Sequence, residues 1–166
     1  MARRFESIWG AVAALLLLLA PLAACAAAED GPKTVEEAVD GFYMALNAMF
    51  TGDLEPMKAA WSHADDVTYM GPAGGFRVGW AAVEADWQSQ ADLKLGGRVE
   101  PIDIHIIQGP EIAIVKNRER GENVGPDGQP APVTLRASLV LRNEGGVWKV
   151  IGHQTDLLPL LSEQPR

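Results

Sequence analysis

Three histidines are the side chains of this sequence that titrate closest to neutral pH. His63 and His105 have no histidine, cysteine or glutamate partner at the short spacing of a zinc-binding motif, so we expect no metal site. His153 has Asp156 close to it in the sequence and is the candidate for a general acid or base. The alternative is a structural histidine that hydrogen-bonds a neighbouring strand, so we assign no catalytic residue and leave open whether the protein is an enzyme.

The N-terminal segment has the organisation of an export signal. Residues 3–4 are arginines, and the apolar stretch that follows, residues 8–20, is shorter than the roughly 20 residues of a transmembrane helix. The run from Leu22 to Cys25, Leu-Ala-Ala-Cys, resembles the lipobox of bacterial lipoproteins, in which the cysteine is acylated and becomes the mature N-terminus. We therefore expect a lipid on Cys25 and a periplasmic, membrane-anchored protein. Ordinary cleavage nearby would instead give a soluble periplasmic or secreted protein.

The charge balance of the chain argues against nucleic-acid binding. The sequence has 14 Lys and Arg against 22 Asp and Glu, a formal net charge of −8, and no run of basic residues. Its single cysteine excludes an intramolecular disulfide. The composition fits one acidic domain with its own apolar core.

Helices come first in the mature sequence and strands follow. Thr34 and Glu37 have the spacing of a capping box, which opens a helix that should end near Gly52. Helical spacing of apolar residues predicts two more helices, at 54–61 and 79–93. From residue 98 onward apolar and polar residues alternate, and glycine-rich turns separate long antiparallel strands. We expect an α+β domain whose helices cover one face of the sheet.

The chain divides into four parts on this basis. They are a signal peptide at 1–24, a flexible tether at 25–33, a single domain at 34–158 and a C-terminal tail at 159–166.

A set of motifs recurs in a recognisable order along residues 34–157. They are Phe42-Tyr43, Gly52-Asp53-Leu54, Trp61, the run 64–67, Gly71-Pro72, Gly75, Gly79, Asp127-Gly128 and the run 148–153. This ordered set resembles the nuclear transport factor 2-like superfamily, in its SnoaL-like and ketosteroid isomerase-like branch. The resemblance implies a cone-shaped barrel in which three N-terminal helices pack on a strongly curved antiparallel sheet and enclose a pocket. It also implies a homodimer through the outer sheet face.

The catalytic pattern of ketosteroid isomerases is only partly present. Those enzymes use a carboxylate base, with a tyrosine and a protonated aspartate that hold the developing oxyanion. Tyr43 matches the tyrosine, but the position of the base is Gly71, and the position of the aspartate falls on or near Ser138. We therefore expect no classical ketosteroid isomerisation.

The same resemblance nominates the residues that face the pocket. The candidates are Tyr43, Trp61, Tyr69, Trp87, Ser138, Ile151, His153 and Thr155. Core packing explains the spacing of the aromatic residues equally well. The apolar alternation from 133 to 141 points those side chains inward, whereas the resemblance points Ser138 inward, and a dimer that buries the second face would reconcile the two.

The arginines of the strands have two interpretations. Arginines 118, 120 and 136 are expected to be exposed or to pair across strands with Glu100, Glu119 and Glu122, and the alternative is that they bind an anionic ligand at the sheet face.

Three functions remain open. The first is the binding of a small apolar or amphipathic molecule, with Tyr43, Ser138 and His153 as polar contacts and no cofactor. The second is a SnoaL-type isomerase, cyclase or lyase that uses His153. The third is a homo-oligomeric assembly module without catalysis. The residues name no ligand, substrate or partner.

Overall fold

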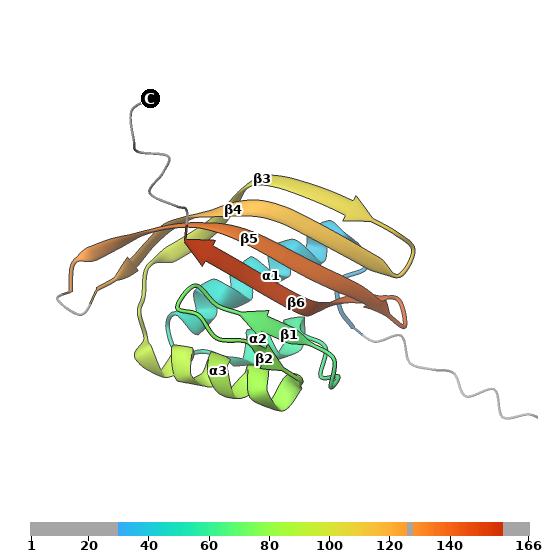
Figure 1. Ribbon diagram of the computed structural model, residues 1–166, viewed down its shortest axis with the longest axis horizontal. Helices are drawn as coiled ribbons and strands as arrows, with labels where there is room; N and C mark the ends of the chain where they lie inside the picture. Colours follow the sequence, from blue (N-terminus) through green and yellow to red (C-terminus); the bar gives the residue numbers. More distant parts are fainter. Residues whose placement is uncertain (1–29, 126–127, 158–166) are drawn as a thin grey trace, which may run out of the picture.

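The computed structural model describes residues 30–125 and 128–157, which form three helices and six strands (Figure 1). The helices are α1 (Val35–Met49), α2 (Glu55–Ala60) and α3 (Trp80–Leu93). The strands are β1 (Thr68–Met70), β2 (Arg77–Val78), β3 (Arg98–Gln108), β4 (Ile112–Val124), β5 (Pro130–Glu144) and β6 (Val147–Leu157). The predicted signal peptide, Cys25 and the tail at 159–166 lie outside the described residues. Within the described ranges no helix is long and apolar enough to cross a membrane.

The first helix begins where the sequence predicted. The Oγ1 of Thr34 accepts a hydrogen bond of 3.1 Å from the backbone N of Glu37, and the Glu37 carboxylate accepts one of 3.3 Å from the backbone N of Thr34. This reciprocal pair satisfies two of the free donors at the helix start. The apolar stripe of α1 is buried, with Phe42 and Met49 fully enclosed, so the helix is fixed against the sheet by packing.

The six strands form one sheet in the order β2-β1-β6-β5-β4-β3. The four long strands β3 to β6 are antiparallel neighbours and arch over α1. Helices α2 and α3 lie on the same side of the sheet, below α1 in the view of Figure 1. Register shifts between Ile102 and His105 and between Val140 and Leu141 mark β-bulges, which increase bending and twist. The predicted α+β arrangement, with helices packed on a curved sheet, is confirmed.

Two details differ from the predicted antiparallel barrel. The sheet is not closed, because β2 and β3 remain edge strands. In addition, β1 pairs in parallel with β6, with Tyr69 opposite His153. The chain enters β1 after an isolated parallel bridge between Trp61 and Val150, so it already runs in the direction of β6 when it reaches the sheet.

The alternation along β5 decides which face points inward. Leu135, Ala137, Leu139 and Leu141 are buried, as their period of two predicted. Ser138 is therefore on the outer face, where its hydroxyl accepts a hydrogen bond of 2.8 Å from Lys116 Nζ. The expectation that Ser138 faces the pocket is corrected, because adjacent residues of a strand point to opposite faces.

Candidate functional site

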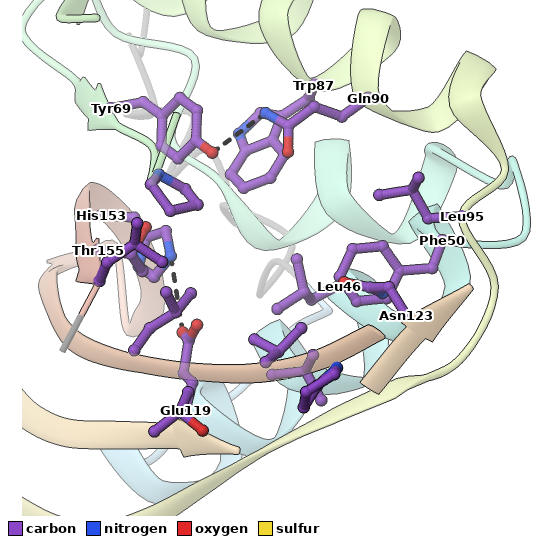
Figure 2. A pocket seen from close by; sticks show the side chains of 17 residues that line it. Leu46, Phe50, Tyr69, Trp87, Gln90, Leu95, Glu119, Asn123, His153 and Thr155 are labelled. Atoms are coloured by element: carbon purple, nitrogen blue, oxygen red, sulfur yellow. Dashed lines mark hydrogen bonds and ion pairs between the residues drawn. The ribbon is translucent and has the colours of Figure 1, made fainter. Parts of the chain in front are cut away.

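A cavity of about 240 Å³ lies between the concave face of the sheet and the helices. Figure 2 shows Glu119, His153 and Thr155 along one side, Tyr69, Trp87 and Gln90 above them, and Phe50, Leu95 and Asn123 at the far end. Most of the lining is apolar or aromatic. The few polar groups are therefore candidates for orienting a ligand.

Glu119 is the acidic residue of the cavity wall. It lies on the inner face of β4 and is only 2% exposed. Tyr43 Oη donates a hydrogen bond of 3.0 Å to Glu119 Oε1, and Asn117 Nδ2 donates one of 2.8 Å to Tyr43 Oη. Burial raises the pKa of Glu119 to about 7, although the bond from Tyr43 opposes the shift. Among the described residues, no group hydrogen-bonds Oε2 of Glu119, so this oxygen remains available to a ligand.

His153 lies beside Glu119 but does not form an ion pair with it at neutral pH. The Nε2 of His153 is 3.8 Å from Glu119 Oε1, which is longer than a hydrogen bond. Burial lowers the pKa of His153 to about 3, with a smaller opposing effect of the Ser138 backbone. The imidazole ring is packed 4.8 Å from the ring of Phe42 and stacks 6.0 Å from that of Tyr69. His153 is thus a neutral ring at neutral pH.

Tyr69 and Trp87 form the aromatic wall of the cavity, with ring centroids 4.3 Å apart. Tyr69 Oη accepts a hydrogen bond of 3.1 Å from Gln90 Nε2, and burial raises the pKa of Tyr69 to about 12. A Cβ atom at Gly71 would lie 2.4 Å from this hydroxyl. The tyrosine therefore occupies the space in which a side chain at position 71 would begin, so the structure has no room for a carboxylate base there.

The predicted pocket residues fall into three groups. Tyr69, Trp87, His153 and Thr155 line the cavity. Tyr43 lies behind Glu119, and Trp61 lies behind Trp87 with its ring 6.1 Å away. Ile151 packs against the core, and Ser138 is on the outer face; neither lines the cavity.

Asp156 does not orient His153. It is exposed, and its carboxylate accepts a hydrogen bond of 3.2 Å from Gln154 Nε2. Positions 153 and 156 are an odd number of residues apart, so their side chains point to opposite faces of β6.

Glu119 is the site residue that the sequence interpretation missed. Glu119 faces the cavity, and Arg118 binds Asp103 instead, with 2.6 Å between Nε and Oδ2. The pairing predicted for Glu119 is therefore wrong. Counting in twos from the buried Ala113 and Val115 reaches Asn117 and Glu119, so strand periodicity carried the signal.

No group of three or more His, Cys, Asp or Glu side chains in residues 30–125 and 128–157 could hold a metal ion. The polar groups of the described cavity wall are the carboxyl group of Glu119, the imidazole of His153, and the amides and hydroxyls of Gln90, Asn123, Tyr69, Thr134 and Thr155.

Comparisons with known proteins agree with the fold. The family model described as the SnoaL-like domain matches residues 35–155, and the chain therefore belongs to the SnoaL-like domain family. A search of curated proteins gave no match.

Solved structures are similar over most of the described chain. A Thiobacillus denitrificans protein, solved as a candidate calcium/calmodulin-dependent protein kinase type II association domain, is 28% identical with a TM-score of 0.68, over 79% of this chain and 100% of that chain. A candidate dehydratase of the NTF2-like family from Streptomyces avermitilis is 20% identical with a TM-score of 0.64, over 75% and 94%. A candidate ketosteroid isomerase from Shewanella frigidimarina is 16% identical with a TM-score of 0.58, over 72% and 91%. At these last two identities the likeness concerns the fold alone.

Proposed function

We propose that this domain binds a small, largely apolar molecule with one polar end in the cavity beneath the sheet. The observation that carries the proposal is the distribution of polarity in the cavity wall. The apolar and aromatic lining surrounds a carboxylate oxygen of Glu119 and the Oγ1 of Thr155, and neither atom has a hydrogen-bond partner among the described residues. Buried polar groups without partners cost free energy that a ligand can recover.

Filling the cavity tests this proposal. Val133 lines the cavity, whereas Val78 is 54% exposed on β2, outside it. Val133→Phe should abolish the binding of cyclohexanol, an apolar ring with one polar group, to the full-length protein in detergent. Val78→Phe is the matched control and should bind like the wild type. Isothermal titration calorimetry measures both, and native mass spectrometry of the purified protein looks for a co-purified molecule that the Val133 variant lacks. If neither probe nor co-purified molecule depends on Val133, the proposal is wrong.

Proton transfer is a second candidate function, favoured by the pKa of Glu119 near 7. A group whose pKa lies near the working pH is the most effective general acid or base. In this case Glu119, rather than His153, would be the general acid or base, because the lowered pKa of His153 makes it a weak base. Exchange of the α-protons of cyclohexanone in D₂O, followed by NMR, is a direct assay. Catalysis by the wild type and its loss in Glu119→Gln would support an enzyme, whereas equal rates with and without protein would exclude this activity for that probe.

Attachment to the periplasmic side of a bacterial membrane is proposed from the sequence of the N-terminal segment. The lipobox-like run ending at Cys25 supports acylation of that cysteine. Mass spectrometry of the N-terminal peptide should find a diacylated Cys25 at the mature N-terminus, and Cys25→Ser should release the protein from membranes. A mature chain that begins after Cys25 would contradict the tether.

Homodimerisation through the outer sheet face is also proposed. Ile104, Ile107 and Ile112 of β3 and β4 are 40–55% exposed, and the Thiobacillus denitrificans structure described above is assigned to an association domain. Ile107→Arg should reduce the mass measured by light scattering from dimer to monomer. An unchanged mass, or a monomeric wild type, would count against this face.

A further inference from the structure

We infer that the polar end of the ligand is a protonated amine, so that the cavity is a site for small amphipathic amines. This inference rests on the proposed binding function and specifies the chemical class that the cavity prefers. It depends on three features of the described residues: the direction of the hydrogen bonds to Glu119, the charges that face it, and the aromatic rings beside it.

The hydrogen bonds to Glu119 make its carboxyl group an acceptor. Asn117 donates to Tyr43, so the single hydroxyl hydrogen of Tyr43 is directed to Glu119 Oε1. Both hydrogen bonds donate towards Glu119, from Asn117 to Tyr43 and from Tyr43 to the carboxylate. The free lone pairs of Oε2 therefore call for a donor from the ligand. The Oγ1 of Thr155, also without a partner among the described residues, can accept a second hydrogen.

No cationic protein group among the described residues balances Glu119. No Lys or Arg lines the described cavity wall. The titratable groups that face Glu119 are Tyr43 from α1, Tyr69 from β1 and His153 from β6. Burial raises the pKa of both tyrosines and lowers that of His153, so all three are uncharged at neutral pH. A buried carboxylate is costly unless it is paired with a positive charge.

The nearest charged groups beyond Tyr69 already neutralise each other. Arg77 Nε is 2.8 Å from Asp86 Oδ2, and both act on Tyr69. Arg77 is not part of the cavity wall and is therefore not the counter-ion of Glu119. A cation supplied by the ligand is the remaining way to pair the carboxylate from inside the cavity.

The aromatic wall suits the same ligand. Tyr69, Trp87 and Phe50 line the cavity, and aromatic rings attract cations as well as apolar groups. An alkylammonium group would contact Glu119 with its charge and the rings with its carbon skeleton. A carboxylate ligand would meet the negative charge of Glu119 and is expected to be excluded.

Three probes with the same ring test the charge preference directly. Cyclohexylamine, cyclohexanol and cyclohexanecarboxylate are titrated by calorimetry into the full-length protein in detergent at pH 8. The expected order is amine, alcohol, carboxylate, with the amine bound about tenfold or more tightly than the alcohol, because a charge-assisted bond is stronger than a neutral one. Glu119→Gln should abolish the preference, so that amine and alcohol bind with similar affinity. The matched control, Glu122→Gln, removes an exposed carboxylate from the same strand and should change neither.

The pH dependence provides a second readout that needs no variant. Cyclohexylamine stays protonated from pH 8 to pH 5, whereas Glu119, with a pKa of about 7, becomes neutral. Amine affinity should then fall as pH drops below 7 and level off at the affinity of the Glu119→Gln variant, while alcohol affinity stays constant. Alcohol binding that equals or exceeds amine binding at pH 8, both blocked by Val133→Phe, would overturn the amine inference and leave the binding function intact. Binding of none of the probes, with no effect of Val133→Phe on any co-purified molecule, would overturn both.

Discussion

The two ends of the concave sheet face are built by the same strands but do different things. At one end β4 and β5 place Ala113, Val115, Leu139 and Leu141 inward, and all four are fully buried. Towards the other end the same strands present Asn117, Glu119 and Leu135, and the space beside Glu119 and Leu135 is the cavity. We call these the filled end and the hollow end. The difference shows that, within a few residues of one strand, the inward side chains change from tightly packed apolar groups to groups that border a cavity.

The largest expected effect concerns the filled end. Leu139→Ala should destabilise the fold by about 3 kcal/mol, because it leaves a void in a fully packed core. Leu135→Ala is the same substitution four residues earlier on the same face of β5. It should cost about 1 kcal/mol, since Leu135 already borders a cavity. Urea unfolding measures both. Equal losses at the two positions would show that the hollow end is as tightly packed in solution as the filled end.

The next effect concerns the carboxyl group of the hollow end. The pKa of Glu119 is raised from 4.5 to about 7, so the folded state holds its proton more tightly and the contribution of Glu119 to stability falls as pH rises between these values. Glu119→Gln should remove this loss and make the protein about 3 kcal/mol more stable at pH 8, with a gain of less than about 1 kcal/mol near pH 5. Glu122→Gln, at an exposed site, should show no such gain. Thermal unfolding as a function of pH decides, and a destabilised Gln variant at pH 8 would contradict the burial of an unpaired charge.

His153 contributes a slope of the opposite sign. Its pKa is lowered from 6.5 to about 3, so stability rises with pH across that interval. From about pH 4.5 to 6.5 the slopes of Glu119 and His153 therefore oppose each other. The wild type should be nearly insensitive to pH there, whereas Glu119→Gln should expose the rising slope of His153. A flat profile in that variant would mean that His153 protonates equally well in the folded and unfolded states.

A smaller effect is expected at Tyr43. Tyr43→Phe removes the donor to Glu119 Oε1 and should cost about 1 kcal/mol at pH 6 and about 2 kcal/mol at pH 8, where the carboxylate is charged. Tyr69→Phe is the control, because Tyr69 bonds the neutral Gln90 and its loss should not depend on pH. Urea unfolding at the two pH values separates these cases. A pH-independent cost at Tyr43 would argue that Glu119 does not change its charge between pH 6 and pH 8.

The smallest effect is expected at Thr155. Its hydroxyl has no hydrogen-bond partner among the described residues and is buried in the cavity wall. Thr155→Val should be neutral or stabilising by less than about 1 kcal/mol, since it replaces an unpaired polar atom with a methyl group of similar size. Thr134→Val, at an exposed position of the same wall, is the control. A clear loss of stability at Thr155 alone would reveal a bound water or ligand in the purified protein.

The sequence by itself determined the elements and most of their faces. The capping box at Thr34 and the inward alternation of β5 follow from local hydrogen bonding and the two-residue period of a strand, which depend only on neighbours along the chain. The export signal and the acylation of Cys25 stay predictions from the sequence, outside the described residues. The resemblance places Ser138 in the pocket, whereas the alternation of β5 correctly places it on the outer face.

Only the tertiary structure decided what the hollow end contains. Tyr43, Glu119 and His153 come from α1, β4 and β6 and meet through sheet pairing and helix packing. Strand alternation separates Glu119 from the exposed Glu122 of the same strand, but which of the two faces is buried depends on where α1 packs. The pKa values of Glu119 and His153 have the same origin, since both are set by removal from water. The sequence thus contains the acid and the imidazole, but the fold alone makes them a site.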